Sequence, residues 1–274
     1  MIADTEADFS HKSNCEDRIM DKRVKGKITV VTGAGGRNIG RALAVGFARE
    51  GARIVLVGRT ESSLADVAAE IEALGGECMV SAADVSVEAD VLRVFSEISE
   101  QLGPVDILLN NAAVNLKCDT VDTDVQDWDR VIEINLRGPF LCSREALKVM
   151  IPRGYGRIIN IASMAGKTAL ATRGAYCASK FALLGLTEAM AAEVNHLDIA
   201  INAISPGHVK EGPPTPGERT RPGSLHPNLV YFALQPPIQP DDIVHTAFFL
   251  ASDEARAIRG KSIDVYYGQD MQEA

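Results

Sequence analysis

The sequence predicts an α/β protein built on one doubly wound parallel sheet of about seven strands, with helices on both faces. Short segments that are apolar throughout alternate along the chain with longer segments whose apolar residues recur at helical spacing. Continuously apolar strands are typical of parallel sheets, because helices cover such sheets on both sides. A glycine-rich stretch, TGAGGRNIG, links the first strand to the first helix.

Seven segments have the length and apolar content expected of buried strands, and helices are expected to fill most of the gaps between them. The first of these segments, KITVVT, directly precedes the glycine-rich stretch. The expected strands are 27–32, 52–58, 77–82, 105–110, 157–161, 199–204 and 262–266.

The first two helices are the best defined. Residues 39–51 place Leu43, Ala44 and Phe47 on one face, and Gly51 is a typical helix C-cap. Residues 61–76 form an amphipathic pattern that is expected to stop at Gly75. The apolar positions of this second helix are Leu64, Val67, Ala68, Ile71 and Leu74.

The 274 residues are expected to form a flexible N-terminal arm, residues 1–25, followed by a single domain, residues 26–274. A proline-rich loop near 208–240 interrupts the alternation, since residues 207–240 hold eight of the 12 prolines. Its place after the sixth strand favours a lid over a substrate pocket. The alternative is a disordered surface insertion.

Composition and charge exclude several classes of function. A net charge of -9 disfavours nucleic acid and anionic membranes as partners, because both require a basic face. The five cysteines are widely spaced without a CxxC pair, which indicates reduced thiols and neither disulfides nor a metal site. No apolar run reaches the roughly 18 residues of a membrane span, and the N-terminus lacks a signal-peptide pattern. A cytoplasmic protein is expected.

The glycine-rich stretch is suited to binding a pyrophosphate at the N-terminus of the first helix. A Cβ atom at such a turn would obstruct the approach of the phosphates. Asn38 is expected to take the place of a further glycine, because asparagine tolerates left-handed backbone geometry. The glycines are Gly33, Gly35, Gly36 and Gly40.

The second strand ends in VLVGRT, without the carboxylate that would bind the ribose 2′-hydroxyl of NAD. Arg59 stands there instead, and Arg37 adds a second positive charge in the glycine turn. Two guanidinium groups suit a 2′-phosphate, so NADP(H) is expected in preference to NAD(H). Alternatively, both are surface arginines of an acidic protein.

The segment AYCASK places Tyr176 and Lys180 one helical turn apart, on the same face. One interpretation is structural: a tyrosine that caps a core face, with a lysine extended beside it. The other is chemical. Transfer of hydride to a carbonyl requires a proton donor, and a nearby lysine cation together with the positive nicotinamide would lower the pKa of a tyrosine from about 10.

These motifs together resemble the short-chain dehydrogenase/reductase family, a Rossmann-fold family of NAD(P)-dependent oxidoreductases, over nearly all of the chain after Lys25. The matching segments are TGAGGRNIG, AADV, NNAA, EINLRG, NIASMAG, YCASK and SPGHV. The resemblance implies a catalytic set of Asn135, Ser163, Tyr176 and Lys180. It places the cofactor contacts on Gly33, Gly35, Arg37, Asn38, Ile39, Gly40, Arg59, Asp84, Val85, Asn111, Ala112, Ala113, Tyr176, Lys180, Pro206, Gly207 and Val209.

The resemblance also assigns the roles. Tyr176 would be the acid in reduction and the base in oxidation. Ser163, 13 residues earlier, would bind the same substrate oxygen, and Asn135 would hold a water-linked proton path to Lys180. Homodimers or homotetramers are implied as well.

The chain departs from the family pattern in three respects. Asn38 replaces a glycine in a turn that is one residue longer, Glu211 stands where a threonine is common, and Tyr266 and Tyr267 replace small or acidic residues. Glu211 and the altered turn support a second hypothesis, a catalytically impaired regulatory or scaffold protein that binds a nucleotide, whereas the two tyrosines suggest a changed C-terminal packing surface. The leading prediction is an NADP(H)-dependent oxidoreductase that interconverts a carbonyl and a secondary alcohol. Oxoacyl thioesters, ketosteroids, sugars and small ketones remain open as substrates.

Overall fold

The computed structural model describes residues 23–36, 38–210 and 237–266. The expected N-terminal arm therefore lies almost wholly outside the described residues, as do Arg37, Glu211, Tyr267 and most of the proline-rich loop. Seven strands are present close to their expected positions. They are β1 (Ile28–Thr32), β2 (Arg53–Gly58), β3 (Cys78–Ala82), β4 (Ile107–Asn110), β5 (Tyr155–Ile161), β6 (Asp198–Pro206) and β7 (Ser262–Val265).

The helices alternate with these strands. The helices are α1 (Ile39–Arg49), α2 (Glu61–Ala73), α3 (Glu88–Gln101), α4 (Val125–Ile132), α5 (Gly138–Arg153), α6 (Gly174–Glu193) and α8 (Pro240–Ala251). Short 3-10 helices are η1 (Thr120–Asp122), η3 (Met164–Gly166) and η4 (Asp253–Ala255), and η2 (Glu133–Arg137) is a π-helical turn between α4 and α5.

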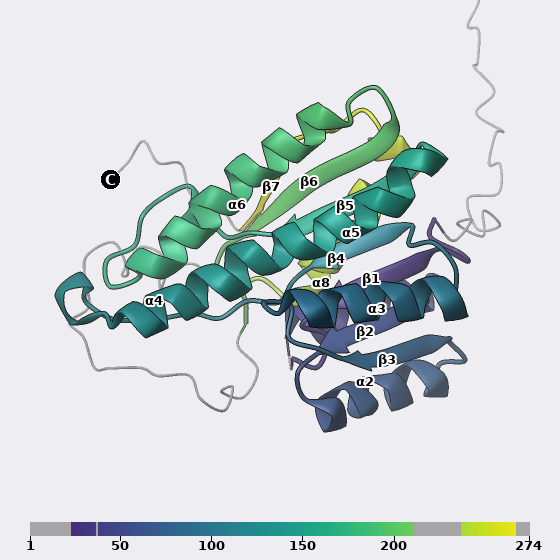
Figure 1. Ribbon diagram of the computed structural model, residues 1–274, viewed down its shortest axis with the longest axis horizontal. Coiled ribbons are helices and arrows are strands. Elements are labelled where there is room, and N and C mark those ends of the chain that lie inside the picture. The colour runs from purple at the N-terminus through teal and green to yellow at the C-terminus, as the bar shows by residue number, and fades with distance from the viewer. Residues whose placement is uncertain (1–22, 37, 211–236, 267–274) are drawn as a thin grey trace, which may run out of the picture.

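The seven strands form one sheet in the order β3-β2-β1-β4-β5-β6-β7, and every neighbouring pair is parallel. Helices cover both faces of this sheet (Figure 1). The predicted fold class, a doubly wound parallel sheet, is confirmed. The strand order reverses between β1 and β4, and in open α/β sheets ligands bind beyond the carboxyl ends of the strands at such a point.

Two hydrophobic cores lie on opposite faces of the sheet. Leu43 and Phe47 of α1, Leu64 of α2 and Ile243 of α8 belong to one core. The other core is built by α3, α5 and α6, for example by Val94, Leu141 and Met190. Because β1 and β4 contribute to both, apolar side chains are required on each side of these strands.

The first two helices follow their predicted patterns with one exception. The predicted core positions of α1 are buried, and Gly51 after it has a φ of +80°. Gly75 after α2 has a φ of +73°, as expected for a glycine that ends a helix. The prediction that Leu74 is a core residue is wrong: it follows the last residue of α2 and is 48% exposed. Among the described helices none has the length and apolar content that would span a membrane.

Candidate active site

The candidate site begins at the carboxyl ends of β1 and β4, where the strand order reverses. Thr32 ends β1, and its hydroxyl oxygen accepts hydrogen bonds from the backbone N–H groups of Asn111 (2.9 Å) and Ala112 (3.1 Å). The Asn111 Nδ2 donates in return to the Thr32 carbonyl oxygen (2.9 Å). These hydrogen bonds hold the segment after β4 against the start of the glycine turn.

The glycines of the turn allow its backbone to pack closely. A Cβ atom on Gly40 would collide with the carbonyl oxygen of Gly33 and lie 2.6 Å from Asn111 Nδ2. Gly33 has a φ of +67°, and a Cβ there would lie 2.9 Å from the Cα of Ala112. Ile39 begins α1 directly above this turn, and the first turn of α1 contains no acidic side chain. The N-terminus of α1 therefore fits a pyrophosphate.

The prediction that Asn38 adopts left-handed geometry is wrong. Its φ is -130°, and its side chain makes no cap hydrogen bond within the described residues. In the described part of the turn Gly33 supplies the positive φ, so asparagine is not needed for that purpose. Gly35 packs against α2, where its Cβ would lie 3.1 Å from Ser63.

Arg59 and Asp84 lie side by side at the carboxyl ends of β2 and β3. The Arg59 Nη1 is 4.0 Å from an Asp84 carboxylate oxygen, and its side chain is 54% exposed. The Asp84 Oδ1 accepts hydrogen bonds from the N–H (2.9 Å) and hydroxyl (2.6 Å) of Ser86. Val85 is buried and belongs to the core below. Arg59 is thus a solvent-accessible cation at the predicted ribose end of the site.

Ser163 and Tyr176 approach one another from β5 and α6. Ser163 lies two residues beyond β5 and caps η3, where its Oγ accepts the N–H of Ala165 (3.1 Å). Tyr176 is in the first turn of α6 and is half-buried. Ser163 and Tyr176, 13 residues apart in sequence, come together because α6 packs closely against η3. A Cβ on Gly166 of η3 would lie only 2.8 Å from the Lys180 carbonyl oxygen.

Lys180 is 2% exposed. Its Nζ donates a hydrogen bond to the carbonyl oxygen of Ile161 (2.8 Å) and lies 5.7 Å from the centre of the Tyr176 ring. Burial lowers the pKa of Lys180 to about 8, since a charged amine is disfavoured away from water. The helical spacing therefore does place both residues at one location.

The prediction that Lys180 lowers the pKa of Tyr176 is not confirmed by this geometry. Burial raises the pKa of Tyr176, and this outweighs the hydrogen bond with Ser163 and the charge of Arg173, which both lower it. The Lys180 amine contributes little because it is turned to the Ile161 carbonyl and is itself easily deprotonated.

Asn135 lies in the π-helical turn and is fully buried. Its amide oxygen accepts the N–H of Val114 (2.8 Å) and its amide nitrogen donates to the Val114 carbonyl oxygen (2.9 Å). The same nitrogen donates to the hydroxyl of Ser179 (3.1 Å), which in turn donates to the carbonyl oxygen of Tyr176 (2.7 Å). The Asn135 amide thus connects the loop after β4 with α6. The wider winding of the π-turn accommodates this inward-facing residue within the run from α4 to α5.

The residues after β6 lie at the same carboxyl edge of the sheet. Pro206 pairs with Val265 at the end of β7, and the Gly207 N–H donates to the Val265 carbonyl oxygen (2.9 Å). A Cβ on Gly207 would lie 2.6 Å from that of Tyr266, so the neighbouring tyrosine itself requires glycine there. Val209 pairs with Ile238 in an isolated bridge, and Ala113 is exposed beside the loop after β4.

Two positioning residues were not identified from the sequence. Ser179 lies within YCASK and Thr32 begins TGAGG, so both stand inside motifs that were noted for other residues. A deeper network was also missed, in which Asn110 donates to Ser143 (3.0 Å) and to Asn160 (2.9 Å), and Asn160 donates to Thr187 (2.8 Å). These partners are 27 to 50 residues apart in sequence. Only the three-dimensional structure places them together.

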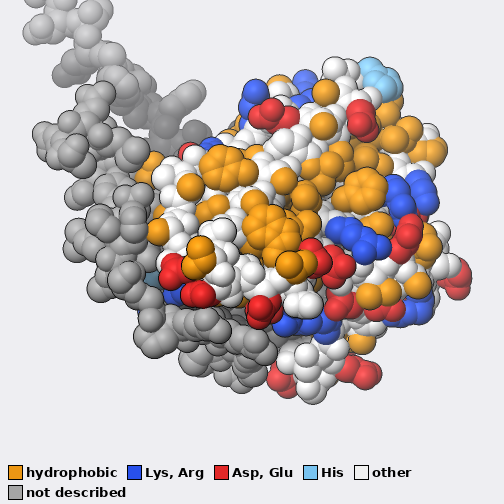
Figure 2. Space-filling model, turned by 60° about the vertical axis from the view of Figure 1, so that its left-hand side comes forward, with side chains coloured by type: hydrophobic (Ala, Val, Ile, Leu, Met, Phe, Trp, Pro, Cys, Tyr) orange, Lys and Arg blue, Asp and Glu red, His pale blue; other side chains and the backbone are white. Residues whose placement is uncertain are grey.

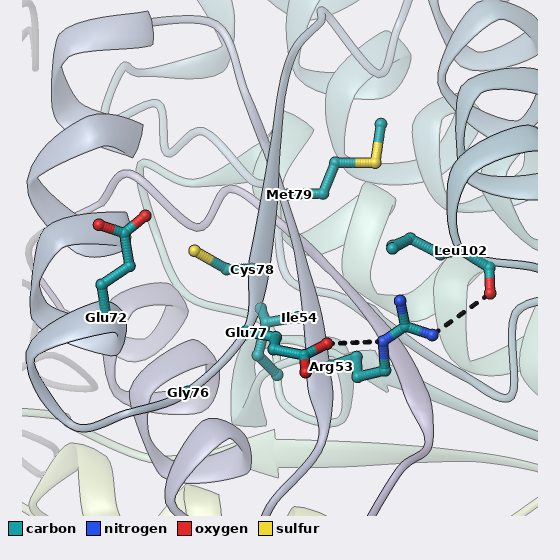
Figure 3. A pocket seen from close by; sticks show the side chains of 8 residues that line it. All are labelled: Arg53, Ile54, Glu72, Gly76, Glu77, Cys78, Met79 and Leu102. Atoms are coloured by element: carbon teal, nitrogen blue, oxygen red, sulfur yellow. Dashed lines mark hydrogen bonds and ion pairs between the residues drawn. The ribbon is translucent and has the colours of Figure 1, made fainter.

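One hollow in the described part of the chain lies away from this site. It has a volume of about 340 Å³ and is lined by Arg53, Cys78, Met79 and neighbouring residues (Figure 3). Arg53 begins β2 and Cys78 begins β3, so this hollow lies at the amino ends of the strands. The motif residues gather at the carboxyl ends, where ligands bind in open α/β sheets.

Comparisons with known proteins agree on one family. A family model described as short chain dehydrogenase matches residues 27–218. A short-chain dehydrogenase/reductase of Armillaria gallica is 38% identical over 248 residues, which are 88% of this chain and 95% of that protein.

Solved structures are similar over the same extent. The structure of actinorhodin polyketide ketoreductase with NADPH has a TM-score of 0.80 and 29% identity, and the match covers 88% of this chain and 96% of that chain. The structure of NAD⁺-bound xylitol dehydrogenase has a TM-score of 0.81 and 30% identity, and the match covers 90% of this chain and 100% of that chain. One relative holds NADPH and the other NAD⁺, so both cofactors occur on this fold.

Proposed function

We propose, from the premise that this chain belongs to the short-chain dehydrogenase family, that Tyr176 is the general acid/base of a carbonyl–alcohol oxidoreductase. The observation that carries the proposal is the convergence of Ser163, Tyr176 and Lys180 at the carboxyl end of the sheet, beside the glycine turn. The relatives are named dehydrogenases and reductases, and none of these names favours the impaired regulatory protein.

The chemistry follows from where the protein groups stand. A bound nicotinamide supplies or accepts the hydride. In reduction, the Tyr176 hydroxyl gives its proton to the developing alkoxide oxygen, which the Ser163 hydroxyl also contacts. In oxidation, the same phenol oxygen takes the proton from the alcohol. Lys180 replenishes this proton, since its pKa of about 8 lies close to neutral pH.

We further propose a preference for NADP(H) over NAD(H). Arg59 supports it, because this exposed cation stands at the end of β2 where NAD-specific sites carry an acid. To bind a 2′-phosphate, the Arg59 guanidinium would leave its contact with Asp84 and pair with the phosphate. Arg37 is the second proposed contact and lies outside the described residues.

The test of the function is consumption of NADPH and NADH by the purified protein with ketones, diketones, ketosteroids and oxoacyl thioesters. Turnover that is lost in Tyr176→Phe supports the proposal. An unchanged rate in that variant would exclude Tyr176 as the acid/base. A kcat/KM for NADH equal to or above that for NADPH would refute the cofactor preference.

We propose that the protein is a cytoplasmic homodimer or homotetramer of one domain, residues 26–274, with its N-terminal arm outside that domain. Trp128 of α4, Phe140 of α5 and Phe181 of α6 are each at least 40% exposed. Figure 2 shows hydrophobic side chains gathered between charged ones on one side of the molecule. Such surfaces suit contact with another subunit. Light scattering after gel filtration measures the mass, and a monomer at micromolar concentration would refute the assembly.

A further inference from the structure

Two buried polar atoms close to Tyr176 have no hydrogen-bond partner in the part of the chain that the structure describes. They are the Nε of Arg173 and the Oδ1 of Asn115. A buried polar atom without a partner is costly, and native proteins seldom retain one without a water, ion or ligand to satisfy it. Neither atom has a role in the acid/base chemistry described above.

Arg173 stands at the N-terminus of the helix that carries the catalytic tyrosine. It is the N-cap of α6, three residues before Tyr176. Its positive charge lowers the pKa of Tyr176, so the guanidinium acts on the phenol from close by. None of the ion pairs between described residues involves Arg173.

Asn115 reaches the same region from the loop after β4. Its neighbour Val114 is held at both backbone groups by Asn135. Three residues later, the N–H of Cys118 donates to the carbonyl oxygen of Thr172 (2.7 Å), and Cys118 pairs with Arg173 in an isolated bridge. The loop that carries Asn115 therefore runs beside the segment that carries Arg173.

The backbone before Arg173 is held in a rare conformation. Thr172 has a φ of +64°, and among the described residues it is the sole non-glycine residue with a positive φ. A β-branched residue in this region is a true outlier, and such outliers concentrate at functional sites. Two contacts fix the segment: the hydrogen bond from Cys118 to Thr172, and one from the Leu170 N–H to the Cys177 sulfur (3.3 Å). The strain thus sets the direction in which Arg173 leaves the backbone.

We propose that Arg173 binds an anionic group of the substrate, a carboxylate or a phosphate, within a few bonds of the reacting carbon. A guanidinium can donate from Nε and one Nη to two oxygens of such a group at once. The inference rests on the proposed function, because it specifies the substrate class of that same site.

The experiment compares pairs of substrates in which one member carries an anionic group and the other is uncharged. Acetoacetate is paired with methyl acetoacetate, levulinate with methyl levulinate, and dihydroxyacetone phosphate with dihydroxyacetone. Steady-state kcat/KM is measured for each with NADPH in excess. The charged member of at least one pair is expected to be preferred by on the order of ten- to a hundredfold. The carboxylate and phosphate pairs distinguish the two sources of charge.

Variants then assign the preference to Arg173. Arg173→Met is expected to abolish the ratio of charged to neutral kcat/KM, and Arg173→Lys to retain part of it. The ratio matters because removal of Arg173 also raises the pKa of Tyr176, and that affects both members of a pair equally. Asn115→Ala should leave the ratio nearly unchanged, because the unpartnered atom of Asn115 is an amide oxygen, which accepts hydrogen bonds and does not bind an anion. Arg256→Met is the control, because it removes the same charge far from the site. Arg256 directly follows η4, and Asp253 of η4 forms an ion pair with Arg157 at the amino end of β5, the opposite end from Ser163.

Each result has one meaning. A preference for the anion that disappears in Arg173→Met and persists in Arg256→Met supports the inference. Equal kcat/KM within each pair, or a preference unchanged in Arg173→Met, overturns the inference and leaves the proposed oxidoreductase intact. Absence of turnover with every compound, including the wider panel of neutral ketones, refutes the proposed function and the inference with it.

Discussion

The amine of Lys180 donates a hydrogen bond to the carbonyl oxygen of Ile161, the last residue of β5, over 2.8 Å. This contact joins the buried face of α6 to the strand that leads to Ser163. The lysine therefore positions the helix that carries Tyr176 as well as holding a proton. Its substitution is expected to affect both stability and activity, and pH separates the two effects.

Stability should depend on pH through Lys180. The amine loses its proton near pH 8 when folded and near pH 10.5 when unfolded. Between these values the unfolded chain binds more protons, so the free energy of unfolding rises with pH, by about 2 kcal/mol from pH 8 to pH 10. Urea unfolding of the wild type and of Lys180→Met measures the difference, and this rise should be missing in the variant. If the wild type and Lys180→Met show the same dependence of stability on pH, burial does not lower the pKa of Lys180.

Tyr176→Phe should lower kcat by roughly 10²- to 10⁴-fold, the usual contribution of a general acid/base. Affinity for NADPH, measured by fluorescence titration, should stay within about threefold, because the phenol oxygen is needed for proton transfer and contributes little to the cofactor contact. Ser163→Ala provides a comparison, with a smaller loss of kcat. If Tyr176→Phe lowers the affinity for NADPH by as large a factor as it lowers kcat, the substitution has disturbed the folding of α6.

Arg59→Ser should raise the KM for NADPH on the order of ten- to a hundredfold and leave the KM for NADH nearly unchanged. The reason is that Arg59 is the described cation placed for the 2′-phosphate, which NADH lacks. Initial rates with both cofactors provide the comparison. Arg53→Ser, at the amino end of β2, is the matched control and should change neither. A similar rise with both cofactors would mean that Arg59 supports the fold of the site.

Asn135→Ala should cost about 1–3 kcal/mol, because the buried N–H and C=O of Val114 both lose their partner. The loop after β4 would also be released from α6, so kcat should fall along with stability. Chemical denaturation and steady-state rates test the two effects. Ser179→Ala breaks the link to Tyr176 alone and should be the milder change.

Gly40→Ala should destabilise the protein by about 1–3 kcal/mol and abolish cofactor binding, since the new methyl group collides with the Gly33 carbonyl oxygen. Gly185→Ala is the control, because that glycine lies inside α6 with nothing within 4 Å of the added Cβ. It should stabilise the helix by roughly 0.5–1 kcal/mol. Thermal unfolding and NADPH titration measure both variants. Normal cofactor affinity in Gly40→Ala would refute the close-packed turn.

The sequence was sufficient to predict the fold, and the motif residues it singled out lie at the carboxyl ends of the strands. Apolar periodicity marked all seven strands, and the spacing of Ser163, Tyr176 and Lys180 matched a known order of motifs. Local pattern failed where burial decides the outcome. The pKa of Tyr176 rises because of desolvation, which depends on how α6 packs on η3. Asn38 was expected to adopt positive φ, yet Gly33 already supplies it.

Long-range contacts were equally inaccessible to pattern analysis. The isolated bridge between Arg173 and Cys118 joins residues that are 55 positions apart in the sequence. The pairing of Asn135 with Val114 also depends on a π-turn, for which helical periodicity gives no signal.

The π-turn has a consequence for the chain's tolerance of length changes. Helix α4, the turn and α5 follow one another without a break from Val125 to Arg153. Each residue of an α-helix advances the helix by about 100°. A π-turn holds one residue more than the α-helical turn that would replace it, so removal of one residue within Glu133–Arg137 should restore regular winding and keep α4 close to its present phase relative to α5. The same deletion inside α4 or α5 would instead turn one part of the run by about 100° relative to the other and should disrupt the packing of α4 on α6.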